Sequence, residues 1–282
     1  SQRITACFRG VPCLDKAEFD RIKTHAADFT QSSFQYAEFE ELTDYWLLRE
    51  DDGLILLRGY NNEAHTDQCL WAANSVDNLI TSLPTRNPFL LTFVPRAWVP
   101  ALEAAGLTIR NIWHDYFRPN LDDIQEDPDT EFEILSPDEI DAASEITLQC
   151  RGQSRGFTGQ TPEWFRQWLS GSEGILNPAI LGYRMNGELV GIVCTGLYGG
   201  EQENGPIVWI REVAVKPNHQ GKGIGRRLVM QALQYGKRHG ARKAFLAVDE
   251  ENLGAVHLYE SLGFIASEEP GEINMVKSAA GS

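Results

Sequence analysis

The chain has 282 residues, 42% of them hydrophobic and 23% charged, and its formal net charge is −15. These values are typical of a soluble globular protein of about two domains, and the negative charge argues against nucleic acid and anionic membrane as partners. No apolar run approaches the ~20 residues that are needed to cross a bilayer.

The five cysteines and the first ten residues indicate the cellular compartment of the protein. The five cysteines are odd in number, are widely scattered and lack the spacing of metal ligands, so the sequence predicts neither a disulfide framework nor a metal site. The first ten residues lack the apolar core of a secretory signal. We therefore expect a cytoplasmic protein.

The first half of the chain contains segments typical of strands and helices but no clear motif. The pattern predicts a strand over 54–60, a helix over 66–83, and a strand, a helix and another strand over 88–118. The stretch 118–135 is polar and acidic and is interrupted by two prolines, so we expect it to be a linker or an exposed crossover.

The second half contains clearer signals for where elements begin and end. Ser136 with Glu139 forms a capping box before an apolar helix, and Thr161 precedes Pro162 at the start of another helix. Asn186-Gly187 joins two strand-like runs and predicts a hairpin. The remaining expected elements are strands over 131–135, 206–215, 243–248 and 273–277, a helix that begins near Ile224 and a helix over 252–264.

Two parts of the chain share a layout of strand, helix, glycine and apolar residues. They are 88–118 and 243–264, and their glycines, Gly106 and Gly263, lie about half a chain apart. We interpret this as two copies of one α/β fold, one over 1–125 and the other over 130–278. Chance recurrence of common strand–helix units is the alternative.

A glycine-rich turn with basic residues follows the strand 206–215. The turn reads Gln220-Gly-Lys-Gly-Ile-Gly225, and no acidic residue occurs between Glu212 and Asp249, whereas eight Lys and Arg do. A phosphate-binding Walker loop would need Ser or Thr after Lys222, and a dinucleotide loop would need glycine in place of Arg226. Glycines ahead of a helix let backbone amides converge on an anion, and a pyrophosphate suits this geometry.

The turn, the strand before it and the segments "FLAV", "N" and "LYESLGF" after it resemble the GNAT superfamily of N-acetyltransferases, over about Glu131 to Lys277. The resemblance implies a mixed, mostly antiparallel sheet flanked by helices, which splays where acetyl-CoA or another acyl-CoA binds. It also implies that the first copy is a degenerate GNAT-like domain without the turn, as in tandem members of the family. The residues that it assigns to the cofactor are Val213, Ala214, Val215, Gln220, Gly221, Lys222, Gly223, Ile224, Gly225, Arg226 and Asn252.

The same resemblance suggests how the reaction proceeds. It places Tyr259 near the thioester sulfur as a proton donor, and Glu212 beside the cofactor strand as the general base. The alternative for Glu212 is an exposed partner of Arg211 or of a neighbouring strand. Phe157 and Trp164 lie where the family covers its substrate, although core packing also explains such aromatic residues.

The expected function is therefore direct transfer of an acetyl group from acetyl-CoA to a primary amine of a small molecule. The alternative is a non-catalytic protein that senses acyl-CoA or serves as a scaffold. No nucleic acid, membrane or metal is expected to take part.

Overall fold

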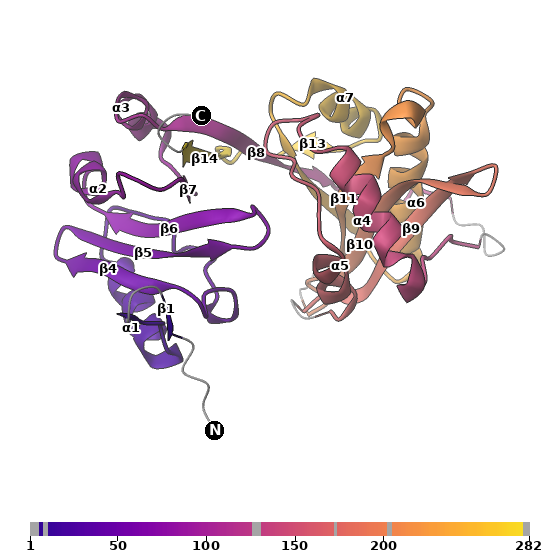
Figure 1. The fold of residues 1–282 in the computed structure, drawn as a ribbon. Helices are drawn as coiled ribbons and strands as arrows, with labels where there is room; N and C mark the ends of the chain where they lie inside the picture. The colour runs from indigo at the N-terminus through magenta and orange to yellow at the C-terminus, as the bar shows by residue number, and fades with distance from the viewer. Residues whose placement is uncertain (1–5, 8–10, 126–130, 172–173, 202–204, 279–282) are drawn as a thin grey trace. The chain divides into compact units, whose positions relative to one another are not determined.

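A computed structural model describes residues 6–7, 11–125, 131–171, 174–201 and 205–278 (Figure 1). The chain packs into two compact units. Unit 1 comprises Ser1–Ile112 and Glu272–Ser282, and unit 2 comprises Trp113–Gly271. These packing bounds differ from the copies expected over 1–125 and 130–278, because residues 113–125 pack with unit 2 and the last strand packs with unit 1.

Unit 1 is a sheet with helices on both faces. Its strands lie in the order β4-β5-β6-β7-β14-β8, and β3 pairs with β6. The elements are β1 (Ala6–Cys7), β2 (Val11–Pro12), α1 (Lys16–Ala26), β3 (Gln31–Ser32), η2 (Phe39–Glu41), β4 (Trp46–Asp51), β5 (Leu54–Asn61), β6 (Thr66–Ala73), α2 (Val76–Ser82), β7 (Phe89–Leu91), η3 (Arg96–Trp98), α3 (Val99–Ala104), the start of β8 (Thr108–Arg118) and β14 (Glu272–Lys277).

Strand β5 shows why the two faces are covered. Leu54 and Leu56 belong to a core cluster with residues of α2 and α3, whereas Ile55 and Leu57 belong to a second cluster with residues of α1. Successive side chains of a strand point to opposite faces, so a continuous apolar run requires a helix on each side.

The helix predicted over 66–83 is wrong in its first half. Residues Thr66–Ala73 form strand β6, and the helix α2 begins only at Val76, where Ser75 caps it by accepting a hydrogen bond from the Asn78 amide. Tertiary pairing explains the difference, because β6 is bonded to β5 along its whole length. The residues between this strand and its helix are thus Asn74-Ser75, and they contain no glycine, Lys or Arg.

Unit 2 is a mixed, mostly antiparallel sheet with two helices on each face. Its strands lie in the order β8-β12-β11-β10-β9, and β13 pairs with β8. The elements are the end of β8, η4 (Pro137–Glu139), α4 (Ile140–Gln149), α5 (Pro162–Leu169), β9 (Leu176–Met185), β10 (Glu188–Tyr198), β11 (Ile207–Val215), η5 (Pro217–His219), α6 (Ile224–Arg238), β12 (Lys243–Asp249), α7 (Leu253–Ser261) and β13 (Ile265–Ala266).

The two core clusters of unit 2 show which helices cover which face. Residues of α6 and α7 share one cluster, which includes Leu228 and Tyr259, and residues of α4 and α5 share the other, which includes Ile146 and Phe165. The helix predicted to begin near Ile224 is confirmed, and α6 buries Ile224, Leu228, Ala232 and Tyr235.

Several local predictions for the second half are confirmed. The capping box of Ser136 and Glu139 forms, Thr161 caps α5, and Asn186 and Gly187 turn the β9–β10 hairpin with φ angles of 51° and 85°. The strand expected over 131–135 is only an isolated bridge between Ile134 and Leu181.

The expected linker over 118–135 is partly buried rather than exposed. Arg118 ends β8 and is 7% exposed, and its guanidinium donates to the Leu262 carbonyl and to Asp123. Leu121 and Ile124 belong to the core of unit 2. Residues 126–130 of the expected linker lie outside the described residues.

Each unit contains a strand that comes from far away in the sequence. In unit 1, β14 from the end of the chain pairs with β7, with Met275 opposite Leu91. In unit 2, residues 113–118 of β8 pair with β12, and Tyr116 and Phe117 also pair with β13. The chain therefore passes from unit 1 to unit 2 within β8 and returns to unit 1 in its last strand.

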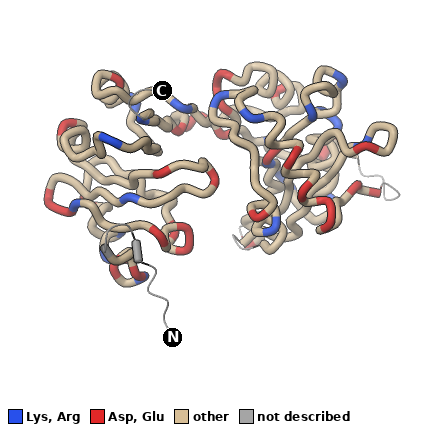
Figure 2. The backbone as a smooth tube through the Cα atoms, viewed as in Figure 1, with Lys and Arg blue, Asp and Glu red and all other residues tan. Residues whose placement is uncertain are grey.

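Acidic residues occur over both units (Figure 2). Cys13 takes part in a disulfide that the scattered cysteine spacing did not predict, whereas Cys69, Cys150 and Cys194 are free and buried. No helix in the described part of the chain is long and apolar enough to cross a membrane.

Candidate active site

The site lies in unit 2, where two parallel strands part. β11 and β12 pair only through Ile207–Trp209 and Lys243–Phe245. The remainder of β11 includes Val213, Ala214 and Val215. It stays paired with β10 but is not paired with β12. Backbone that has left its neighbour in a sheet can bond a ligand instead.

Glu212 lies on a β-bulge in this part of β11. Ile192 pairs with Ala214 and Cys194 pairs with Arg211, so Val193 faces two residues, Glu212 and Val213. Glu212 has a φ angle of 50°, a conformation that is uncommon for any residue except glycine. Bulges redirect side chains, and strained backbone is found preferentially at functional sites.

The side chain of Glu212 is held by a residue that the sequence analysis did not identify. Gln160 lies just before α5, and its Nε2 donates to Glu212 Oε1 at 3.1 Å. A lone glutamine before a helix carries no sequence signal for such a role. Only its place in the loop that covers the expected substrate could have suggested it.

The glycine turn contains two residues in the left-handed conformation that favours glycine. Gly221 and Gly223 have φ angles of 75° and 77°, and a Cβ at either position would meet no atom within 4 Å. Gly223 precedes α6, and no side chain caps this helix. Side chains cap α1, α2, α5 and α7, but none caps α3 or α4. The first amides of a helix have no partners within the helix. Together with the helix dipole, they attract an anion.

The basic residues of this segment divide between the two ends of α6. Lys222, Arg226 and Arg227 are exposed at its start. Arg226 donates to Ser261 on α7 at 2.6 Å, and Arg227 bonds the hydroxyl of Tyr183. The basic residues after position 236 lie at or beyond the far end of the helix, and Lys216, which precedes the turn, forms an ion pair with Glu188 at 2.6 Å.

Tyr259 and Asn252 lie on α7. Tyr259 is 9% exposed and contacts Phe264, with ring centroids 6.1 Å apart. Burial raises the pKa of Tyr259 to about 12, so the phenol is protonated at neutral pH, which is the state that a proton donor requires. Asn252 caps α7 by accepting a hydrogen bond from the Ala255 amide at 3.3 Å.

The loop between α4 and α5 is bonded to both strands of the site. Gln153 Oε1 accepts from Gln220 Nε2 at 2.6 Å, and the same Gln220 nitrogen donates to the Val215 carbonyl at 2.9 Å. On the other side, Arg155 forms ion pairs with Asp249 at 3.1 Å and Glu251 at 2.8 Å. One loop thus connects the glycine turn to the end of β12.

The two aromatic residues expected to contact substrate both pack partly against the core formed with α4 and α5. Trp164 stacks on Trp168 with centroids 6.0 Å apart, and Arg211 lies over the Trp164 ring at 5.0 Å. Phe157 is half-buried in the loop before α5.

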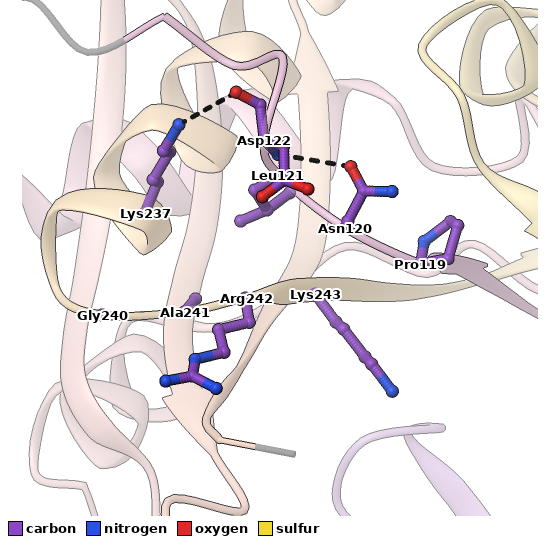
Figure 3. A pocket seen from close by; sticks show the side chains of 9 residues that line it. All are labelled: Pro119, Asn120, Leu121, Asp122, Lys237, Gly240, Ala241, Arg242 and Lys243. Atoms are coloured by element: carbon purple, nitrogen blue, oxygen red, sulfur yellow. Dashed lines mark hydrogen bonds between the residues drawn. The ribbon is translucent and has the colours of Figure 1, made fainter.

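A pocket of 570 Å³ lies at the opposite end of α6 (Figure 3). There, Lys237 donates to the Asp122 carbonyl at 3.4 Å. None of the predicted site residues lines it. Its lining residues are Pro119, Asn120, Leu121, Asp122, Lys237, Gly240, Ala241, Arg242 and Lys243.

Comparison with solved structures identifies the fold. A GCN5-related N-acetyltransferase from Sphaerobacter thermophilus superposes with a TM-score of 0.53 at 16% identity, and the match covers 86% of this chain and 82% of that one. Identity this low shows a shared fold alone. The chain thus has the same mixed α/β fold as that protein.

Sequence comparison identifies the family. The model of the acetyltransferase (GNAT) family matches residues 140–264. A probable spermine N(1)-acetyltransferase of Bacillus subtilis subsp. natto is 31% identical over 104 residues, which are 34% of this chain and 68% of that protein. The chain belongs to the GNAT family, as its glycine turn led us to expect.

Two other relatives match over smaller parts of their length. An uncharacterized N-acetyltransferase of Methanocaldococcus jannaschii is 34% identical over 40% of this chain and 50% of its own. The mycothiol acetyltransferase of Thermobispora bispora is 42% identical over 28% of this chain and 27% of its own. The chain therefore spans half or less of these two relatives.

Proposed function

We propose that unit 2 transfers an acetyl group from acetyl-CoA to a primary amine of a small molecule, by direct attack in a ternary complex. The observation that carries the proposal is the conformation of the glycine turn before α6. Two glycines with positive φ precede a helix that no side chain caps, next to the part of β11 that has left β12. Membership of the GNAT family supports the same chemistry.

In this proposal the cofactor lies along β11 and ends at the glycine turn. The backbone of Val213–Val215 bonds the pantetheine arm, the amides of the turn from Gln220 to Gly225 surround the pyrophosphate, and Arg226 and Lys222 add positive charge. Asn252 uses its amide oxygen to cap α7, which leaves its amide nitrogen to bond the pantetheine region.

Two side chains carry the proton transfers. Glu212 accepts a proton from the amine, directly or through water, as the nitrogen attacks the thioester carbonyl. The new C–N bond forms and the C–S bond breaks, and Tyr259 gives a proton to the departing thiolate. Holding both reactants in one site lowers the entropic part of the barrier, so no covalent intermediate with the enzyme is required.

The acceptor is a small amine held beside the loop between α4 and α5. The names of two relatives refer to acetylation of spermine and of mycothiol. Phe157 and Trp164 form an aromatic wall in this proposal, with the apolar part of the acceptor packed against it.

Unit 1 is a degenerate copy of the same fold without a cofactor site. Its counterpart of β11 is β6, and the edge of β6 is already paired with β3, where Gln31 lies opposite Ala73. The indole of Trp71, also on β6, donates a hydrogen bond to the carbonyl of Thr92, just after β7, at 3.1 Å. The protein itself therefore bridges β6 and the end of β7. Asp77 also places a negative charge in the first turn of α2, which disfavours an anion there.

The experiment incubates the full chain with acetyl-CoA and a panel of small primary amines that includes spermine. We expect CoA release that depends on the amine, an acetylated product detected by mass spectrometry, and a rise in Tm with acetyl-CoA alone. A rise in Tm without turnover on any amine would instead identify a non-catalytic sensor. The absence of a Tm rise would contradict the cofactor site itself.

A further inference from the structure

Gln160 is fixed in place by its backbone rather than by its side chain. Its amide donates to Thr147 Oγ1 at 2.9 Å, and its carbonyl accepts from Ser144 Oγ at 2.6 Å. Both partners are buried on α4. A change of the Gln160 side chain therefore leaves the anchoring of this loop intact.

The residue before it makes this approach possible. Gly159 has a φ angle of 74°, and a Cβ there would lie 2.8 Å from the Thr147 carbonyl oxygen and 2.9 Å from Leu148 Cα. Only glycine fits between the loop and the backbone of α4. The loop is therefore shaped to bring Gln160 toward β11.

The side chain of Gln160 is a poor choice for stability alone. The residue is 3% exposed, and its Oε1 is buried with no hydrogen-bond partner among the described residues. A buried carbonyl without a donor costs free energy of folding, whereas an apolar side chain of the same length would not. The other end of the amide, Nε2, donates to Glu212 Oε1. Within the described part of the chain, that bond is the only contribution of the Gln160 side chain that an apolar residue could not replace.

Glu212 is thus held from two elements. The bulge in β11 sets the direction of its backbone, and the loop before α5 sets the direction of its carboxylate. A general base acts efficiently only when it is held within a small distance of its productive position, and the residues behind it supply that precision.

We propose that Gln160 is a positioning residue for Glu212, whose amide holds the carboxylate in the orientation that accepts the proton of the attacking amine. The inference rests on the proposed function of Glu212 as the general base. It assigns no contact between Gln160 and either substrate.

The first test replaces Gln160 with methionine, which keeps the length of the side chain and removes the donor. We expect kcat to fall about tenfold, a fraction of the 10²–10⁴-fold that a general base contributes. We expect the KM for acetyl-CoA to stay within about twofold and Tm to stay equal or rise, because the unpaired carbonyl is gone. Gln149→Met, on the exposed end of α4, is the matched control and should leave all three values unchanged. An unchanged kcat, or a loss of activity that only follows a fall in Tm, would overturn the proposal.

The second test is a double-mutant cycle with Glu212→Gln. If Gln160 acts through Glu212, Gln160→Met should lower kcat in the native background and have no further effect in Glu212→Gln. An equal effect in both backgrounds would overturn the positioning role while leaving the base intact. An unchanged kcat in Glu212→Gln alone would instead refute Glu212 as the base, so the two failures are distinguishable.

Discussion

At the scale of single residues, positive φ angles decide whether the turn before α6 can form. Gly221 and Gly223 adopt this conformation at the start of the helix, and Gly240 adopts it just after the end, with a φ angle of 93°. A Cβ at any of the three would meet no atom within 4 Å. The penalty for a larger residue is therefore backbone strain rather than a steric clash.

Gly223→Ala should weaken acetyl-CoA binding for two reasons. Backbone strain moves the amides of the turn so that they no longer point at the pyrophosphate, and the added methyl group occupies space beside the pyrophosphate. We expect the Kd from calorimetry to rise about tenfold or more, with a loss of about 1 kcal/mol in stability. Gly240→Ala is the matched control at the other end of the same helix. It should lose similar stability and bind acetyl-CoA with unchanged Kd. Equal affinities in the two variants would refute the pyrophosphate site.

Tyr259→Phe removes the proposed proton donor and keeps the ring that packs against Phe264. We expect kcat to fall about 10²-fold, within the range for general acids, and the Kd for acetyl-CoA to change less than threefold. Steady-state kinetics and calorimetry check the two values. A native kcat in this variant would eliminate Tyr259 from the proton transfer.

The raised pKa of Tyr259 also predicts how stability varies at alkaline pH. Its value is about 12 in the fold and 10 for a free phenol, so the folded state keeps this proton between pH 10 and 12 while the unfolded state loses it. Its stabilisation is therefore complete below pH 10 and is lost as the pH rises to 12, at a cost of about 2 kcal/mol. In Tyr259→Phe, the free energy of unfolding by urea should decline less over this range than in the native chain. Parallel declines would contradict this prediction.

At the scale of elements, the loop between α4 and α5 is the connection between the two sides of the site. Arg155 reaches Asp249, which is 2% exposed at the end of β12. Asp249 also accepts a hydrogen bond from the Glu251 amide at 3.0 Å, and that bond does not depend on Arg155.

Arg155→Met should destabilise the protein by about 2 kcal/mol, because a buried carboxylate loses its positive partner. The corresponding fall in Tm is about 5 °C for a unit of this size. The KM for the amine should rise as the loop is released from β12. Arg166→Met is the control, because Arg166 is 54% exposed and its ion pairs are worth less than about 0.5 kcal/mol. Similar Tm values for the two variants would show that the Arg155 pair is not structural.

At the scale of the whole molecule, the sheets are completed by strands from distant parts of the sequence. β14 follows unit 2 along the chain but completes the sheet of unit 1, where Ile273 and Met275 are buried in its core. A substitution in β14 should therefore change the stability of unit 1.

Met275→Ala should destabilise unit 1 by about 2–5 kcal/mol, since it leaves a cavity in the core that β14 forms with α2 and α3. We expect faster hydrogen exchange in β6 and β7, and native exchange in β11 and native affinity for acetyl-CoA. Met185→Ala is the control, as Met185 is only half-buried at the end of β9 in unit 2. Faster exchange in β11 and β12 with β7 unchanged would contradict the division into units.

The sequence by itself determined what depends on neighbouring residues. The capping box at Ser136, the hairpin at Asn186-Gly187 and the start of a helix at Ile224, after the glycine turn, are all local patterns, and each forms as predicted. Family membership could be inferred for the same reason, since the turn and the helix after it are contiguous.

Only the tertiary structure decided what depends on distant residues. Thr66–Ala73 is a strand because β5 pairs with it, and the final strand lies in unit 1 because β7 bonds it there. The same holds at the site. Gln160 reaches Glu212 across 52 residues, through a glycine that lets the loop lie against α4 and a bulge that turns β11. Pairings over such separations are selected by packing and burial, which no local pattern encodes.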